Sequence, residues 1–198
     1  ARIETLQQEL DEAARRARYD PLTGQLNRLG VSEALDREVA RAQRHGQPLS
    51  VALVDMDGMQ ALNAELGHAM GDAALVHVAQ LARQGLRPED VVGRYEGQAF
   101  VLLLPQTPET AGAQALQRLL QLLEQAPLPA SAQTPGQPAP RPLSFSAGVA
   151  QLQGHENGMD VLRRADTAML QAKERGKHCI ATASGAQSQP VGNAGAGL

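Results

Sequence analysis

Two short apolar runs with a polar break between them constrain the fold of this chain more than any other stretch. Residues 91–92 and 100–104 are apolar, and Glu96-Gly97-Gln98 lies between them. The glycine can adopt the positive φ of a tight turn, so the pattern predicts a β-hairpin. Because a buried sheet holds functional groups rigidly at such tips, we expect the tip to lie at a functional site.

The composition narrows the class of protein. Of the 198 residues, 42% are apolar but only 2% aromatic, so Leu, Ala and Val must fill the core of one domain. The net charge of −3 gives no support for a nucleic-acid partner, and a single cysteine, Cys179, fits a reducing cytosol. There is no apolar run of about 18 residues that could insert into a membrane, and the first residues lack the basic-then-apolar layout of a signal peptide. We therefore expect a cytoplasmic protein, and because the chain starts within a helical pattern we expect it to be part of something longer.

Residues 1–18 have the pattern of an amphipathic helix. Apolar side chains recur at alternating spacings of three and four, at Ile3, Leu6, Leu10, Ala13 and Ala17. One interpretation is a helix that packs on its own domain. The other, which we favour, is the end of a parallel coiled coil that carries a signal from an upstream sensor and joins two copies as a homodimer.

The rest of the chain alternates between helical and strand patterns. Apolar runs at 49–54 and 143–150 predict buried strands. Helices are expected over 31–45, 72–84, 107–124 and 159–175. The third of these is expected to open at Thr107-Pro108, with threonine as the cap. Prolines make 126–142 a surface loop, and 183–198 have the composition of a disordered tail.

Two carboxylates follow the first predicted strand, at Asp55 and Asp57. Carboxylates at the end of a buried strand are ligands that a hard cation such as Mg²⁺ prefers. Aspartates at strand ends also simply begin turns, so this pair alone leaves both interpretations open.

Several motifs, in order along residues 16–182, resemble the GGDEF (diguanylate cyclase) family. The resemblance implies an α/β fold with a central mixed, mainly antiparallel sheet flanked by helices, related to nucleotide-cyclase and polymerase palms. It divides the chain into a signalling helix (1–18), a GGDEF domain (19–182) and a tail (183–198). The matching runs are Asp20-Pro-Leu-Thr-Gly24, Asn63-Ala-Glu-Leu-Gly-His68 with Gly71-Asp72, Arg87-Pro-Glu-Asp90, Glu96-Gly97-Gln98-Ala99-Phe100, and Ala172-Lys-Glu-Arg-Gly-Lys177.

The resemblance assigns nucleotide-binding roles to five residues. Asp55 would bind a metal ion, and Asn63 and Asp72 would recognise the guanine of GTP. Lys173 and Lys177 would contact its phosphates, and Mg²⁺ would be needed only if GTP is bound. The alternatives are that Asp72 begins a helix and that both lysines are solvated at a helix end.

The signature itself departs from the family. Glu96 stands where the family has its first glycine, and Gln98 and Ala99 stand where it has two acids. Gln60 stands where it usually has a lysine. Because an uncharged amide is a weaker Mg²⁺ ligand than a carboxylate, these residues predict that the chain is not an enzyme but a pseudo-enzyme of the family.

A second site is kept. Arg87 and Asp90 form the Arg-x-x-Asp motif with which the family binds its product, cyclic di-GMP, a bacterial second messenger. Arg118 stands where the family often has a further arginine. These residues predict a cyclic di-GMP receptor, although such a motif also occurs as a plain surface ion pair. The alternatives are a GTP-binding regulatory domain without turnover, a nucleotide-free dimerisation or interaction module, and a weak residual cyclase.

Overall fold

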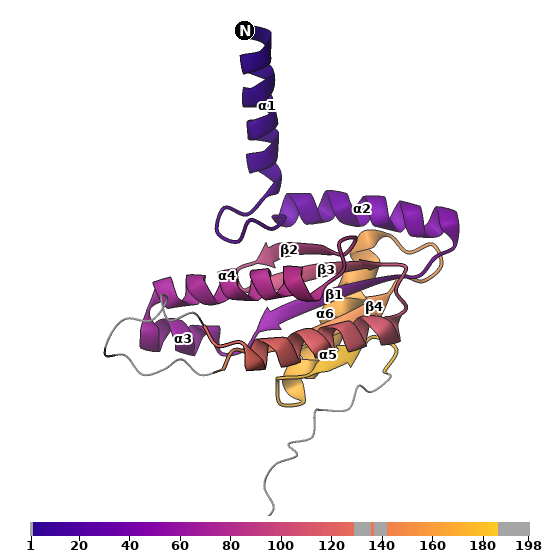
Figure 1. Cartoon of the computed structure of the whole chain (residues 1–198). Coiled ribbons are helices and arrows are strands. Elements are labelled where there is room, and N and C mark those ends of the chain that lie inside the picture. Colours follow the sequence, from indigo (N-terminus) through magenta and orange to yellow (C-terminus); the bar gives the residue numbers. More distant parts are fainter. Residues whose placement is uncertain (1, 129–135, 137–141, 186–198) are drawn as a thin grey trace, which may run out of the picture.

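A five-stranded sheet forms the centre of the protein (Figure 1), in a computed structural model that describes residues 2–128, 136 and 142–185. The strand order is β2-β3-β1-β4-β5, and neighbours are antiparallel except for the parallel pair β4 and β5. This confirms the predicted mixed, mainly antiparallel sheet. The strands are β1 (Leu49–Met56), β2 (Val91–Glu96), β3 (Ala99–Pro105), β4 (Phe145–Gln151) and β5 (Ile180–Thr182).

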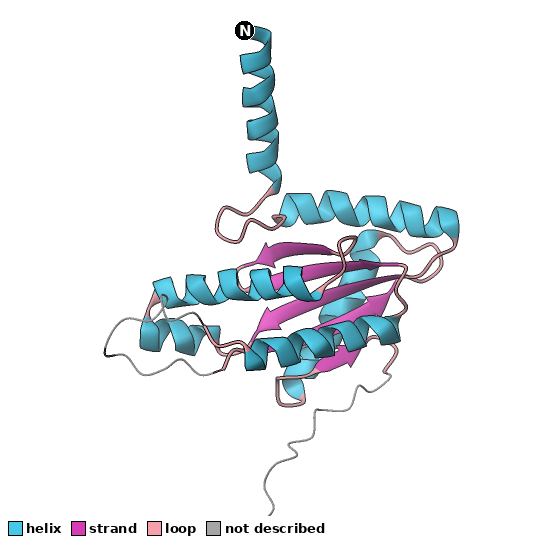
Figure 2. Cartoon of the chain, in the orientation of Figure 1, coloured by secondary structure: helices cyan, strands magenta, loops and turns pink. Residues whose placement is uncertain are grey.

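Helices cover both faces of the sheet, which gives the flanked α/β architecture that we expected (Figure 2). Helices α3, α4 and α5 pack on one face, and α2 and α6 pack on the other. The helices are α1 (Arg2–Arg18), α2 (Arg28–His45), α3 (Met59–Leu66), α4 (His68–Gly85), α5 (Glu109–Gln125) and α6 (Gly158–Glu174).

The central strand β1 is apolar on both faces because it is covered on both. Val54 packs in the cluster with α4 and α5, and its neighbour Leu53 packs in the cluster with α2 and α6. Each such side chain contributes about 1.5–3 kcal/mol when fully buried. The register with β3 places Asp55 opposite Ala99, so the end of β1 lies beside the hairpin tip.

A glycine lets α6 approach the sheet closely. A Cβ added at Gly148 of β4 would lie 2.0 Å from the carbonyl oxygen of Ala165 and 2.2 Å from the backbone nitrogen of Met169. No other residue allows the helix backbone so near. This contact fixes where α6 presents its side chains, which include Lys173.

Helix α1 projects away from the rest of the protein (Figure 1). It has no buried residue, and Ile3, Leu6 and Leu10 are 75%, 57% and 69% exposed. The interpretation in which this helix packs on its own domain is therefore wrong. The coiled coil remains a prediction.

Some elements differ from those predicted. Helix α4 begins at His68 after Gly67, earlier than expected, so Asp72 neither caps it nor lies in its first turn. The preceding helix α3 was not predicted, because its eight residues are too few to show a clear helical period. Helix α5 follows Pro108 as its cap residue, and the Thr107 hydroxyl instead donates to the carbonyl oxygen of Pro105 at 2.8 Å.

The C-terminal part of the fold includes β5, which at three residues is too short to be recognised in the sequence. The predicted loop over 126–142 and the predicted tail over 183–198 lie mostly outside the described residues. The structure nevertheless continues past residue 182. There the backbone nitrogen of Ser184 donates to Glu109 Oε1 at 3.3 Å.

No helix in the described ranges combines the length of a membrane span with sufficient apolar character.

Candidate functional site

The hairpin tip forms where predicted, with Gly97 at φ +48. Arg94 holds it, since its Nε donates to the Gly97 carbonyl at 2.8 Å and its Nη1 to Asp20 Oδ1 at 3.2 Å. Burial alone would raise the pKa of Asp20, but hydrogen bonds from Thr23 and the nearby Arg94 charge outweigh it and lower that pKa. The tip is thus tied to the loop that follows α1. The sequence predicted no role for either residue.

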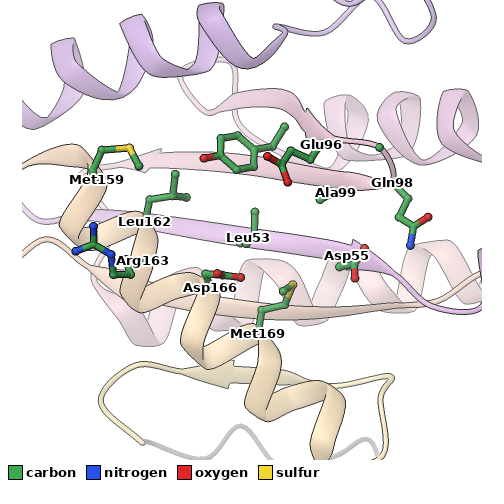
Figure 3. A pocket seen from close by; sticks show the side chains of 12 residues that line it. Leu53, Asp55, Glu96, Gln98, Ala99, Met159, Leu162, Arg163, Asp166 and Met169 are labelled. Atoms are coloured by element: carbon green, nitrogen blue, oxygen red, sulfur yellow. The ribbon is translucent and has the colours of Figure 1, made fainter.

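A cavity of about 520 Å³ lies between this tip and α6 (Figure 3). Asp55 lines it together with Gln98 and Ala99, so the structure brings these three positions together. Glu96 also lines it but is paired with Arg28, whose Nη1 lies 2.7 Å from Glu96 Oε1. The negative charge of Glu96 is therefore partly balanced.

Asp55 is not free in this cavity. Its Oδ2 forms an ion pair with Lys173 Nζ, and the two side chains are only 19% and 25% exposed. The sequence suggested a metal ligand and a phosphate ligand, and the structure places the two in direct contact. A cation that binds Asp55 through Oδ2 would displace the lysine ammonium, which would then be available to a phosphate.

The residues around Asp55 fit a magnesium ion only under one condition. Mg²⁺ is commonly held by one or two carboxylates together with substrate phosphates. Asp55 offers one carboxylate, and the amide of Gln98 lines the same cavity. Among the residues with assigned positions, no three His, Cys, Asp or Glu side chains gather as a metal site. These residues therefore fit a magnesium ion on the condition that a bound triphosphate supplies further oxygen ligands.

The second strand-end carboxylate, Asp57, stabilises the fold. Its Oδ1 accepts from Ser146 Oγ at 2.8 Å, and its Oδ2 accepts from Ser144 Oγ and from the His178 backbone nitrogen, both at 3.0 Å. Asp57 thus joins the end of β1 to the loop before β5. Lys177 lies in this loop with φ +66 and is exposed.

The two predicted guanine ligands lie elsewhere, on α3 and α4. Asn63 Oδ1 is buried and has no hydrogen-bond partner within the described part of the chain. A Cβ at Gly71 would lie 1.8 Å from that oxygen, so glycine makes room for the amide. Asp72 is exposed on the next position of α4. Neither residue lines the cavity with Asp55.

A separate cavity of about 350 Å³ lies between the end of α4 and α5, and it is lined by Arg87, Asp90 and Arg118. The structure therefore brings together the three residues that the sequence suggested. Arg118 is exposed and has no hydrogen-bond or ion-pair partner among the residues that the structure describes.

Arg87 is held in place while half of its side chain stays exposed. Its Nη2 donates to Asp90 Oδ1 at 3.3 Å, to the Pro105 carbonyl at 3.0 Å and to Thr107 Oγ1 at 2.6 Å. Asp90 is only 4% exposed and also accepts from the Arg87 backbone nitrogen at 2.9 Å. Because Asp90 is buried, its contacts orient Arg87.

A residue that sequence reasoning missed supports the same loop. Arg83 donates from Nη1 to the Asp90 carbonyl at 3.1 Å and from Nη2 to the Arg87 carbonyl at 2.9 Å. The signal available in the sequence was its position one helical turn before Arg87.

Residues 17–179 match the family described as "Diguanylate cyclase, GGDEF domain". The chain belongs to the GGDEF family. Diguanylate cyclase DgcP of Pseudomonas aeruginosa is 38% identical over 168 residues, which cover 85% of this chain and 24% of DgcP. The chain thus spans well under half the length of DgcP and of diguanylate cyclase DosC of Escherichia coli, another curated relative that it matches.

Solved structures of GGDEF proteins share the fold. The coiled coil and GGDEF domain of DgcB from Caulobacter crescentus, in complex with c-di-GMP, matches with a TM-score of 0.85 at 26% identity, over 91% of this chain and 93% of DgcB. Diguanylate cyclase SiaD of Pseudomonas aeruginosa, in complex with its activator SiaC, matches with a TM-score of 0.77 at 33% identity, over 91% of this chain and 68% of SiaD.

These relatives correct one prediction. The chain was expected not to be an enzyme, but DgcP and other relatives are named diguanylate cyclases, which points to a GGDEF enzyme. The prediction gave Gln98 and Ala99 more weight than the retained Asp55 and Lys173. An amide oxygen and the oxygens of a bound triphosphate are also Mg²⁺ ligands, so replacing a carboxylate does not by itself remove a metal site.

Proposed function

We propose that this GGDEF domain binds cyclic di-GMP in the cavity between α4 and α5. One observation carries the proposal. Arg118, which has no partner in the described ranges, lines the same cavity as the anchored and half-exposed Arg87. Two such guanidinium groups at one cavity favour an anionic ligand.

Cyclic di-GMP suits these groups chemically. It carries two phosphates and two guanines, and a guanidinium binds phosphate through two parallel hydrogen bonds or stacks on a base. The three contacts of Arg87 Nη2 orient its guanidinium before the ligand arrives, so little side-chain entropy is lost on binding. The structure of DgcB in complex with c-di-GMP supports the choice of ligand.

Titration calorimetry with cyclic di-GMP tests the proposal. A charge-assisted contact contributes roughly 1.5–3 kcal/mol, so Arg118→Ala should weaken binding about ten- to a hundredfold. Arg44→Ala, an exposed arginine on α2 that lines neither cavity, is the matched control and should bind like the wild type. Absence of binding by the wild type, or a loss with Arg44→Ala alone, would contradict the proposal.

We also propose that GTP with Mg²⁺ binds at the hairpin tip, where Asp55, Lys173 and Gln98 come together. Lys173 and Lys177 would contact the phosphates, and Asn63 and Asp72 would contact the base. The observation in favour is the Asp55–Lys173 pair, a carboxylate and an ammonium that a metal-bound triphosphate can separate and use.

Adding a carboxylate at the tip tests this second ligand. Gln98→Glu should tighten Mg²⁺-dependent GTP binding and raise the rate of cyclic di-GMP formation about tenfold or more, because a charged ligand joins Asp55. Gln80→Glu, on the exposed surface of α4, adds the same charge away from the site and should change neither quantity. Equal effects of the two substitutions would refute the assignment.

We infer that the domain passes its ligand state to attached domains through residues 1–18, which would pair two copies as a coiled coil. The exposed apolar side chains of α1 support this inference. The SiaD structure shows one relative in complex with an activator protein.

A further inference from the structure

The cavity at the hairpin tip is larger than a metal site requires. From Asp55 it extends along α6 past Asp166 and Arg163 to Met159 (Figure 3). Its volume of about 520 Å³ lies within the range of roughly 300–1,000 Å³ that is typical of small-ligand pockets. Neither the metal role of Asp55 nor the phosphate role of Lys173 uses the α6 end of this space.

The wall and floor of this end are apolar. A flat ring lying on such side chains would be excluded from water on one face, which favours aromatic or heterocyclic ligands. The side chains concerned are Leu53, Leu162 and Met169.

Asp166 supplies the polar contact in this apolar surrounding. It is partly buried, lines the cavity, and forms no hydrogen bond or ion pair with any residue that the structure describes. An unpaired carboxylate at an apolar surface is costly unless donors reach it. Arg163, one turn before it, has only a 3.6 Å pair with Asp160 Oδ1 and is 72% exposed. Such a pair is weak enough to be exchanged for a ligand.

We propose that this end of the cavity binds the base of a guanine nucleotide. The guanine N1–H and amino group are two adjacent donors, and a carboxylate, which only accepts, matches both. Arg163 then lies within reach of the O6 acceptor or of the phosphate. Adenine presents one donor and one acceptor along the same edge and would leave Asp166 half satisfied. This base position lies on the opposite helical layer from Asn63 and Asp72, so it belongs to a second nucleotide rather than to the GTP of the proposed function, and it is also separate from the cyclic di-GMP cavity.

The methionines of the chain make the test specific. Met159 and Met169 line this cavity, whereas Met59 and Met70 pack in the cluster with α3 and α4 on the other face. With ¹³C-methyl methionine in the full chain, NMR titration with guanosine 5′-monophosphate should shift Met159 and Met169 saturably. Adenosine 5′-monophosphate should need at least a tenfold higher concentration for the same shifts.

Asp166→Asn keeps the shape of the side chain but replaces one acceptor oxygen with a donor, so it should weaken the guanosine monophosphate response at least tenfold. Asp11→Asn, on the exposed helix α1, is the matched control and should leave the response unchanged. Shifts confined to Met59 and Met70, or no shifts at millimolar nucleotide, would overturn the proposal. Equal responses to the two nucleotides that survive Asp166→Asn would also overturn it, because they would indicate stacking without recognition.

Discussion

Asp90 is expected to act on ligand binding entirely through Arg87. Asp90→Ala removes the acceptor of the Arg87 backbone N–H at 2.9 Å and of Nη2 at 3.3 Å. An unsatisfied buried donor costs about 1–3 kcal/mol, and the contact to the half-exposed guanidinium contributes less than a fully buried one because solvent screens it. The substitution should therefore lower the free energy of unfolding by about 2–3 kcal/mol.

The effect on affinity follows from the same contacts. Without Asp90, the guanidinium of Arg87 keeps the Pro105 carbonyl and Thr107 Oγ1 as partners but is less firmly oriented. Cyclic di-GMP binding should weaken about tenfold, since part of the binding energy must now order the side chain. Urea unfolding followed by circular dichroism measures the stability, because the chain has no tryptophan for fluorescence. Calorimetry measures the affinity.

A neighbouring acid provides the matched control. Glu89 Oε1 lies 3.5 Å from Arg87 Nη1, and both side chains are about half exposed. Glu89→Ala should change the free energy of unfolding by no more than about 0.5 kcal/mol. If Asp90→Ala costs no more stability than Glu89→Ala, or if it destabilises the protein without weakening ligand binding, the positioning role of Asp90 is refuted.

Three further predictions concern the stability of the domain and its association through residues 1–18. Gly148→Ala places a Cβ against the backbone of α6 and should lower the free energy of unfolding by about 3 kcal/mol in urea titrations; a loss under 1 kcal/mol would contradict the close approach. Asp20→Asn should reduce stability at pH 7. The pKa of Asp20 is lower in the folded state than its ordinary value of 3.8. The stability difference between wild type and Asp20→Asn should therefore shrink as the pH falls from 3.8 through the folded-state pKa. A stability difference that does not depend on pH would exclude the Arg94 ion pair as its source. Removing residues 1–18 should lower the dimer content in sedimentation velocity, and an unchanged association state would contradict the coiled coil.

The sequence predicted those parts of the fold whose signal is local. The hairpin follows from two apolar runs around Gly97, and the buried strand β1 follows from one apolar run between breakers. Two short elements, α3 and β5, were missed because each has too few residues for its apolar pattern to repeat clearly. Helix α4 begins early because Gly67, rather than Asp72, ends the preceding turn.

The residues of the candidate sites also fall into two groups, those that the sequence could place and those that it could not. The sequence could place Arg87, Asp90 and Arg118 together because a motif and a helix position marked them. It could not show that Asp90 is buried beneath Arg87, or that Lys173 pairs with Asp55, since both depend on how α6 and the β-sheet pack. Asp57 shows the same limit. Its three partners come from segments that are distant in the sequence.

A crystal structure of this chain with cyclic di-GMP tests the central claim most directly. The proposal predicts ligand density between the end of α4 and α5, with the Arg118 and Arg87 guanidinium groups within hydrogen-bond distance of a phosphate or against a guanine face. Ligand density only in the cavity lined by Asp55 and Gln98 would contradict the proposal. So would crystals without ligand, grown under conditions in which calorimetry detects binding to the Arg118→Ala variant.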